Sequence, residues 1–422
     1  MRGFSCGAQQ RVVVVVALVA GCGLETKPPP SDRAAFPTGL ALHQDGQHLV
    51  VVSSDFDLSF DSGAVLVVDL AAARPKLTGA DAVVNDAFVS QVTLAPFGDR
   101  PVFDASGEHV FLTTRGENQL NEIDFANGAL SCGGATACGQ APFVAQLANN
   151  DPFDVVLIDG PSVRGIVTHL SSNEAEFFSF DPTDNGPQRL RLELQSVLFS
   201  ESTSGVRSTV FRAASVDNDA PQLFVALEQR LEEALIGTQL GVFDVPAVNR
   251  GDDVEVFSVD VTATTGSLSA RSLALVPDAD GGVAVVIALR APDALARFAY
   301  DDADRTFTLT ALHETCKEPT NFAFVDAVVD EVGAVTGPAR LLLTCQGGEV
   351  VQALDPLTLD VRDSVRFFGR SPYDVVVDPV QQQAFVSFFL DNSIGVLSLS
   401  NGRLTPQGRI GEALPPAQDG RE

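Results

Sequence analysis

The feature that most constrains the fold is a unit of apolar, strand-like runs that recurs through most of the 422-residue chain. Each clear copy opens with Pro, one further residue, then Gly, Asp or Asn and an apolar run. The openings that align best begin at Pro37, Pro152, Pro319 and Pro372. A turn and a second run follow, and third runs end at Asp69, Asp124, Asp181, Asp260 and Asp355. Self-similarity of this kind is the signature of a repeat architecture.

Less regular copies begin near Arg100, Gly205 and Arg271, so that seven copies spaced about 48 to 66 residues apart fit between residues 36 and 412. Val-, Phe- and Leu-rich runs with period-two alternation, separated by Gly, Asp, Asn and Pro, are strand and turn signals. Four such runs in a unit of about 50 residues are typical of one propeller blade. We therefore predict an all-β fold, a β-propeller of seven blades with four antiparallel strands each. A count of six or eight blades stays open.

These openings, the Asp-terminated runs and the turns at Asp45-Gly46 and Ser106-Gly107 make the chain similar to the YVTN-repeat and lactonase-like seven-bladed propellers. The resemblance covers about 375 residues and is weakest in the fourth and fifth copies. It implies the fold and not the activity, because propellers host many unrelated functions. The channel-mouth residues of the lactonase-like relatives cannot be matched to this chain one by one.

The first 21 residues are typical of an export signal. Residues 1–11 carry two Arg and no acidic residue, and residues 12–20 form an apolar run too short to span a bilayer. The small residues before Cys22 resemble the lipobox of bacterial lipoproteins. The resemblance implies cleavage before Cys22, lipidation of Cys22 and a membrane anchor, and Gly23 favours the outer membrane. The alternative is an ordinary secretory signal with an incidental Cys.

The remaining chain divides by composition. Residues 22–35 contain three consecutive prolines and are expected to form a stiff tether between the lipid and the folded body. Residues 36–412 are expected to form the propeller, and residues 413–422 a C-terminal tail.

One segment interrupts the strand pattern in the fourth copy. Residues 227–253 include EQRLEEAL, which has helical spacing. We expect an insertion on the rim that caps the channel, contacts a partner or is simply solvated. Because residues 403–410 can supply the last outer strand, we also predict that the ring closes by side-to-side packing alone.

Four cysteines lie in the expected folded body. Cys132 and Cys138 are six residues apart, and Cys316 and Cys345 are 29 apart. An even number in an exported protein suggests two disulfides. Of the three pairings we favour the local one, and the absence of CxxC spacing disfavours a zinc site.

Charge and motifs limit the function. The chain has 55 acidic and 27 basic residues, a net charge of -28, which disfavours nucleic acid as a partner. It contains no GxSxG or HExxH motif, and its five His are scattered, so no catalytic residue is identified.

The channel offers candidate binding residues, because the first strand of each propeller blade lines it. The residues expected at its mouth are Asp154, Asn321, Asp374, Arg100, Arg271 and Arg370. Such a mixed ring can bind a small polar ligand or an ion. It can equally be the hydrated lining that every propeller needs.

A second candidate is a calcium site, since oxygen-rich loops suit this ion. The densest acidic cluster is Asp55, Asp57 and Asp61. Acidic residues are also ordinary at β-turns. No other cofactor is expected.

These observations favour a monomeric, lipid-anchored envelope protein that binds or scaffolds a protein, peptide or glycan partner. The alternative is a lactonase-like or other hydrolytic enzyme with a site in the central funnel, with or without Ca²⁺. An enzyme should hold acid or base groups with shifted pKa values in the funnel. A scaffold should expose an apolar patch at a rim.

Overall fold

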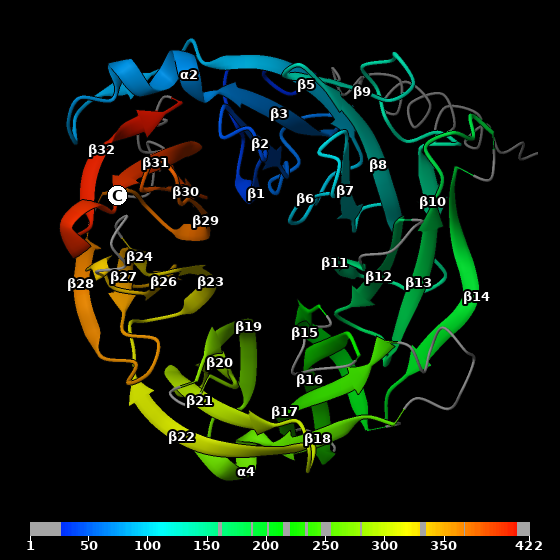
Figure 1. Ribbon diagram of the computed structural model, residues 1–422. Coiled ribbons are helices and arrows are strands. Elements are labelled where there is room, and N and C mark those ends of the chain that lie inside the picture. The colour runs from blue at the N-terminus through cyan, green and yellow to red at the C-terminus, as the bar shows by residue number, and fades with distance from the viewer. Residues whose placement is uncertain are drawn as a thin grey trace, which may run out of the picture.

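The computed structural model describes residues 27–411 except 159–162, 187–188, 201, 214–219, 233–234, 246–254, 279–280, 330–334 and 367. Seven sheets surround a central channel, and each contains four antiparallel strands in a path from the channel to the outside (Figure 1). The predicted all-β, seven-bladed propeller is therefore confirmed. The signal, Cys22 and the tail 413–422 lie outside the described residues.

The first three blades follow the chain order. Blade 1 contains β1 (Pro37–Leu42), β2 (His48–Ser53), β3 (Gly63–Asp69) and β5 (Phe88–Leu94). Blade 2 contains β6 (Val102–Phe103), β7 (His109–Thr114), β8 (Gln119–Ala126), β9 (Ala129–Ser131) and β10 (Val144–Gln146), the last two both paired with β8. Blade 3 contains β11 (Pro152–Ile158), β12 (Val163–His169), β13 (Glu174–Phe180) and β14 (Leu190–Leu198).

The other four blades continue the ring. Blade 4 contains β15 (Thr203–Arg212), β16 (Gln222–Glu232), β17 (Leu235–Asp244) and β18 (Phe257–Asp260). Blade 5 contains β19 (Ser269–Pro277), β20 (Val283–Arg290), β21 (Ala294–Asp301) and β22 (Thr306–Glu314). Blade 6 contains β23 (Pro319–Val325), β26 (Arg340–Cys345), β27 (Val350–Leu354) and β28 (Val361–Arg366), with an added hairpin of β24 (Val328–Val329) and β25 (Val335–Gly337). Blade 7 contains β29 (Pro372–Asp378), β30 (Gln383–Phe388), β31 (Ser393–Ser398) and β32 (Thr405–Ile410).

Helices are few and short. The described ones are α2 (Leu70–Ala73), η1 (Arg74–Lys76), α4 (Val261–Thr265) and η2 (Ser400–Gly402). Asp69 caps α2 and Asp260 caps α4, each by accepting a hydrogen bond from a backbone N–H three residues on. Among the described residues, no helix has the length and apolar character needed to cross a membrane.

The repeat openings share one backbone geometry. The four aligned prolines are the first residues of β1, β11, β23 and β29, and the residue before each has a positive φ of 49° to 57°. The strand register shifts directly after each of these prolines. Pro has no N–H to give to the ladder, so it is tolerated at the start of a strand beside a bulge.

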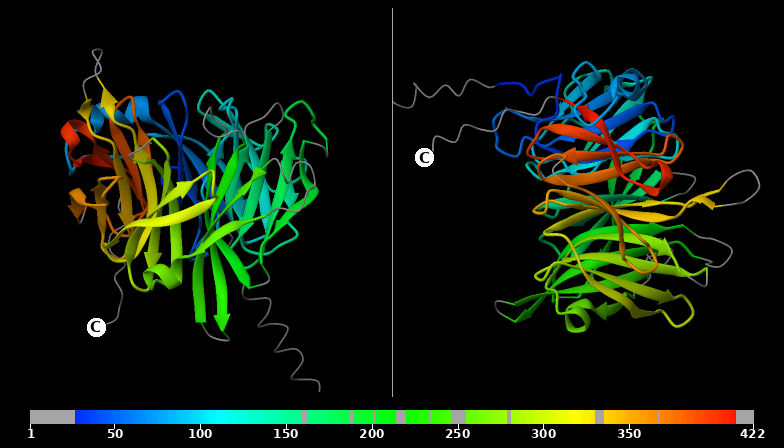
Figure 2. Two further views of the ribbon diagram at one scale, coloured as in Figure 1. Left: turned by 60° about the horizontal axis from the view of Figure 1, so that its bottom comes forward. Right: turned by 90° about the vertical axis from the view of Figure 1, so that its left-hand side faces the viewer.

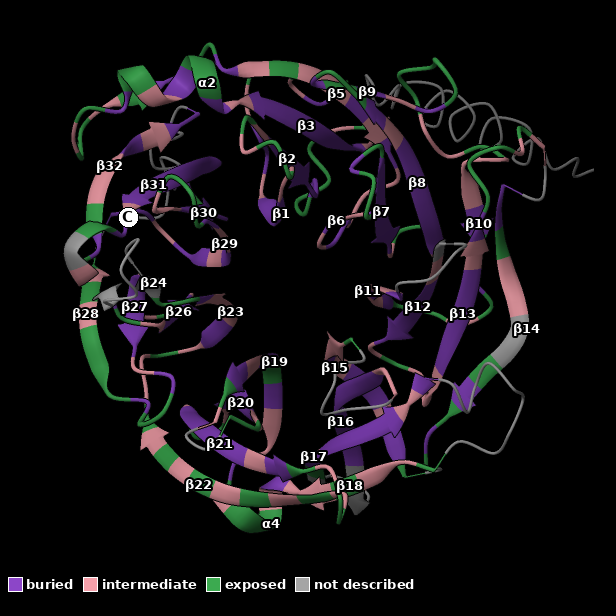
Figure 3. Cartoon of the chain, viewed as in Figure 1, coloured by how far each residue is buried: buried purple, intermediate pink, exposed green. Residues whose placement is uncertain are grey.

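The hydrophobic core consists of seven clusters, one between each pair of successive blades. The two middle strands of each blade are buried on both faces, as the purple strands of Figure 3 show. The outer strands β22 and β28 alternate between half-buried and exposed residues. A blade thus buries its faces only against its neighbours, which requires a closed ring.

The prediction for residues 227–253 was wrong in its helical part. Residues 228–232 of this segment belong to β16, and in its long hairpin with β17 Gln229 pairs with Gly237. The two strands are green in Figure 2. Pairing between strands overrides the helical propensity of this segment. Asp260 ends the outer strand of blade 4 and not its third strand, which ends at Asp244. Residues 246–253 lie outside the described chain.

Ring closure was also only partly predicted. β32 does complete blade 7, but β4 (Val83–Val84) of the segment between β3 and β5 pairs with it in parallel, Val84 opposite Ile410. The N–H of Arg409 donates to the carbonyl of Ala82 (2.8 Å). We call β4 the strap, because it extends from blade 1 across the junction between blades 7 and 1. The ring therefore does not close by side-to-side packing alone.

Both local disulfides are present. Cys132 is bonded to Cys138 and Cys316 to Cys345, with Cα–Cα distances of 5.5 and 6.0 Å. The first closes a loop of blade 2, and the second ties the entry of β23 to the end of β26.

Candidate anion-binding site at the channel mouth

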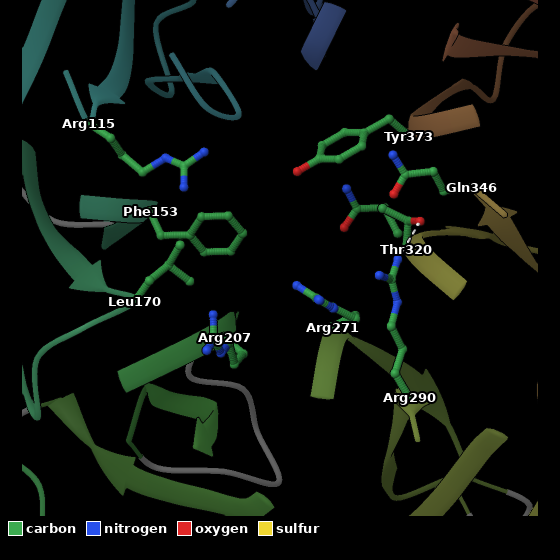
Figure 4. A pocket seen from close by; sticks show the side chains of 10 residues that line it. Arg115, Phe153, Leu170, Arg207, Arg271, Arg290, Thr320, Gln346 and Tyr373 are labelled. Atoms are coloured by element: carbon green, nitrogen blue, oxygen red, sulfur yellow. Dashed lines mark hydrogen bonds between the residues drawn. The ribbon is translucent and has the colours of Figure 1, made fainter. Parts of the chain in front are cut away.

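A cavity of about 250 Å³ lies at the end of the channel where the innermost strands begin. Blades 2 to 7 all contribute to it, either from the first half of their innermost strands or from the last residue of the second strand and the residue after it. Its lining residues are Arg115, Phe153, Leu170, Arg207, Arg271, Arg290, Thr320, Asn321, Gln346 and Tyr373. Figure 4 shows these side chains facing one another across an open centre.

Four of the lining residues are arginines, in a chain whose net charge is -28. Arg271 is exposed in the channel and has no ion pair or hydrogen bond within the described part of the chain. The surrounding channel walls still displace part of the water around its guanidinium, which lowers the pKa of Arg271, and the nearby positive charges of Arg290 and Arg207 lower it further. Several positive charges around one cavity repel one another, and a bound anion would relieve this repulsion.

The other three arginines have partial partners. Arg290 donates to the carbonyl of Pro319 (3.2 Å) and to the hydroxyl of Thr320 (3.4 Å), both uncharged acceptors. Arg207 is paired with Glu228. Arg115 Nε lies 3.4 Å from Asp99 Oδ2. The mouth therefore has more positive charge than its own carboxylates balance.

A second, smaller cavity of about 30 Å³ adjoins the first. On several innermost strands its lining residue comes one position later in the chain than the residue that lines the first cavity. It shares Phe153, Arg271, Asn321 and Tyr373 with the first cavity and adds Thr38, Asp99, Arg100, Asp154 and Ser208. An acidic layer thus lies behind the arginines.

The carboxylates of this layer differ in how many hydrogen bonds they accept. Asp374 is fully buried and accepts hydrogen bonds from Arg100 (3.0 Å) and from the N–H of Leu40 (2.9 Å). Asp154 accepts from the hydroxyl (2.6 Å) and the N–H (3.1 Å) of Thr209, and burial raises its pKa. Both are held as parts of the wall.

Asp99 differs from them. Its side chain is 6% exposed, and its Oδ2 has no hydrogen-bond partner among the described residues. Burial, together with the nearby charges of Asp154 and Asp374, raises its pKa to about 7 despite the opposing effect of Arg115. Burial also raises the pKa of Tyr373 to about 12, so its hydroxyl stays protonated at neutral pH. Asp99 can therefore take up or release a proton near pH 7.

Five of the six expected channel residues come together here. Asn321 and Arg271 line the first cavity, Asp154 and Arg100 the second, and Asp374 binds Arg100.

Arg370 does not join them. Its Nε donates to Asp391 (2.6 Å) and its Nη2 to the carbonyl of Leu390 (2.9 Å) instead.

The sequence interpretation missed five ionisable residues of the site. These are Asp99, Arg115, Arg207, Arg290 and Tyr373. The repeat itself could have pointed to some of the lining residues. The position directly after a repeat-opening proline is occupied by Phe153, Thr320 and Tyr373. The position directly after the second strand of a blade is occupied by Arg115, Leu170 and Gln346. Equivalent positions of a repeat converge at one end of the ring.

The acidic cluster expected to hold calcium lies in the loop after β2. Asp55 and Asp57 each accept a hydrogen bond from a nearby backbone N–H, at 3.1 Å in both cases. Among the described residues, the three carboxylates of Asp55, Asp57 and Asp61 do not converge on a common point as metal ligands do. Calcium binding by this cluster stays a prediction.

Comparison with known proteins supports the fold. No family model and no curated protein sequence matches this chain. Among solved structures, a periplasmic gluconolactonase from Pseudomonas aeruginosa is similar (TM-score 0.54, 17% identity, 80% of this chain and 87% of the other). A candidate 6-phosphogluconolactonase from Bacteroides fragilis (0.52, 16%, 79% and 85%) and the hydrazine synthase of Kuenenia stuttgartiensis (0.57, 13%, 90% and 99%) are also similar. The chain is thus a seven-bladed β-propeller with lactonase-like structural neighbours, and at these identities the likeness concerns the fold.

Proposed function

We propose that the channel mouth binds a small hydroxylated anion of the sugar-acid class and hydrolyses the corresponding lactone. The observation that carries this proposal is the set of four arginines on one cavity, with Arg271 and Arg290 lacking a carboxylate partner in the described chain. Guanidinium groups bind carboxylate and phosphate oxygens in a planar, bidentate way. A cavity of about 250 Å³ suits a monosaccharide-sized ligand and excludes a polymer.

The same residues can support lactone hydrolysis. Asp99 would accept a proton from water, whose oxygen attacks the lactone carbonyl carbon. Arg271 and the Tyr373 hydroxyl would stabilise the oxyanion that forms. When the ring C–O bond breaks, Asp99 would return the proton to the leaving oxygen, so that water and lactone give one hydroxy acid. The gluconolactonase-like neighbours make this reaction class the first to test.

One observation favours a second candidate, a binding or scaffolding module for a protein, peptide or glycan. The side chain of Phe56 is 53% exposed, and its ring contacts Phe389 (5.3 Å between centroids), which in turn contacts Tyr373 (5.8 Å). This aromatic strip leads from the surface to the mouth. Aromatic faces suit the packing of a partner.

Export and a lipid anchor at Cys22 belong to the proposal as well. They rest on the signal-like N-terminus and its Ala-Gly-Cys ending. An extracytoplasmic location agrees with the two disulfides.

The test is calorimetric titration with gluconate and 6-phosphogluconate, with glucose as the neutral control, followed by pH-stat assay of the lactones. Both anions should bind and glucose should not. Arg271→Gln should weaken anion binding by at least about tenfold.

Arg362→Gln is the matched control, because Arg362 lies on the outer strand β28 and its side chain is 57% exposed. It should leave anion binding unchanged. Binding without hydrolysis would favour the second candidate, and no binding of any anion would contradict the proposal.

A further inference from the structure

Three side chains of blade 1 meet at the opposite end of the innermost strands, around the turn between β1 and β2. Nδ1 of His43 lies 2.9 Å and Nδ1 of His48 2.7 Å from the same Oδ2 of Asp45. The three atoms lie within 4.8 Å of one another. Two imidazoles and a carboxylate are the ligand types that zinc and similar ions prefer.

Blade 2 holds both rings in place. A Cβ on Gly107 or Gly128 would lie 2.6 Å from Nε2 of His43 or of His48, so only glycine leaves space for the rings there. Phe125 packs on both rings, at 4.7 Å from His43 and 5.6 Å from His48 between centroids. The Nε2 side of each ring therefore packs against blade 2, and Nδ1 faces Asp45. A metal would meet ligands that are already oriented.

The group is also open to solvent. It borders a groove of about 590 Å³ between blades 1 and 2. The side chains of His43, Asp45 and His48 are 14%, 34% and 21% exposed. An ion can enter from the groove, and a water molecule can complete its coordination.

A neighbouring cluster shows what distinguishes this one. His109, Glu122 and Asp124 also converge, but Arg189 donates to Glu122 (2.9 and 3.0 Å) and to Asp124 (2.5 Å). A guanidinium already supplies the positive charge there. No Lys or Arg pairs with Asp45 in the described chain.

We propose that His43, Asp45 and His48 bind a divalent transition-metal ion, with Zn²⁺ the best match. Ligand atoms at about 2.0–2.1 Å around tetrahedral zinc are roughly 3.3 Å apart, so the two nitrogen–oxygen separations of 2.9 and 2.7 Å need to lengthen by about 0.4 and 0.6 Å. Hard ions such as Ca²⁺ are excluded because they prefer oxygen ligands. The site is separate from the channel mouth and does not depend on its proposed function.

The test uses the full-length, metal-free protein titrated with Co²⁺, followed by competition with Zn²⁺. We expect the visible absorption bands of four-coordinate Co²⁺, displaced by Zn²⁺, and a Zn²⁺-dependent rise in Tm. His48→Gln should weaken binding by at least about tenfold. Asp45→Asn keeps a turn-forming oxygen while removing the charge, so it tests the ligand even if the histidine variant folds poorly.

Two controls make the assignment specific. His313→Gln, on the outer strand β22, should bind Co²⁺ as the wild type does. Loss of binding in His109→Gln but not in His48→Gln would place the metal at the neighbouring cluster and overturn the proposal. Absence of the Co²⁺ bands in the wild type would overturn it as well.

Discussion

Asp99 is the residue at the channel mouth whose environment departs most from that of an ordinary carboxyl group. Burial raises its pKa from 3.8 to about 7, and Arg115 beside it lowers the pKa without cancelling the effect of burial. The same shift has opposite consequences for catalysis and for stability, because the charged form is the reactive one and the neutral form is the one that burial favours.

For catalysis, we expect the kcat/KM for lactone hydrolysis to rise with pH through about 7 and then level off, because only ionised Asp99 can accept a proton. Asp99→Asn should lower kcat by roughly 10²–10⁴-fold. The pH–rate profile of both proteins measures this. A profile that is flat from pH 5 to 9 would remove Asp99 from the mechanism.

For stability, the sign is reversed. Between about pH 4 and 7 the folded protein keeps a proton on Asp99 that the unfolded chain has released, so the free energy of unfolding falls as pH rises. The loss is at most about 4 kcal/mol. Asp99→Asn should therefore raise Tm more at pH 8 than at pH 4. Thermal unfolding at both values measures this, and an equal shift at the two would contradict it.

At the scale of elements, the strap β4 decides how the ring closes. Val84 is 2% exposed and packs in the cluster between blades 7 and 1, whereas Val83 is 53% exposed. Both residues pair with β32, so they differ in burial and not in backbone bonding. We therefore expect ring closure to depend on the packing of the Val84 side chain and not on that of Val83.

This difference gives a matched pair of variants. Val84→Ala should lower the free energy of unfolding by about 2 kcal/mol, because about 0.8 kcal/mol is lost for each buried methyl group and a cavity remains. Val83→Ala should change it by less than about 0.5 kcal/mol. Urea unfolding measures both. Equal losses would mean that the strap does not close the ring.

At the scale of the molecule, the net charge and the proposed lipid anchor bear on where the protein would act. A body with a net charge of -28 repels anions at long range, and the arginines of the mouth offset this locally. The described body begins at residue 27, five residues after Cys22. A lipid on Cys22 would thus hold the ring close to the membrane.

Cys22→Ala should move the protein from the membrane fraction to the soluble fraction, because two acyl chains are needed for stable anchoring. Fractionation followed by immunoblotting measures this. Cys132→Ala, which leaves the lipobox intact, should stay with the membrane. Unchanged membrane association of the Cys22 variant would show that the lipobox interpretation is wrong.

The fold was predictable because its determinants are local and repeated. Pro37, Pro152, Pro319 and Pro372 mark the strand openings directly, since Pro fits only where the ladder needs no N–H. The last part of β16, residues 228–232, was not predictable, because its sequence has a helical pattern and only pairing with β17 makes it extended. Arg370 shows the same limit at the site, since it pairs with Asp391 of the same blade and does not line the channel cavities.

The sequence by itself determined the all-β propeller class, and it predicted seven blades, the local disulfides and the approach of Asp154, Asn321 and Asp374 to the channel, because each depends on spacing within a repeat. Only the tertiary structure decided which arginines gather at the mouth and how deeply Asp99 is buried. It also decided that β4 pairs with β32, and that His43 and His48 both contact Asp45 while packing against blade 2. These depend on which blades become neighbours and how their side chains pack. The physical reason is that local propensity acts over a few residues, whereas burial and charge proximity arise between segments that the ring brings together from far apart in the chain.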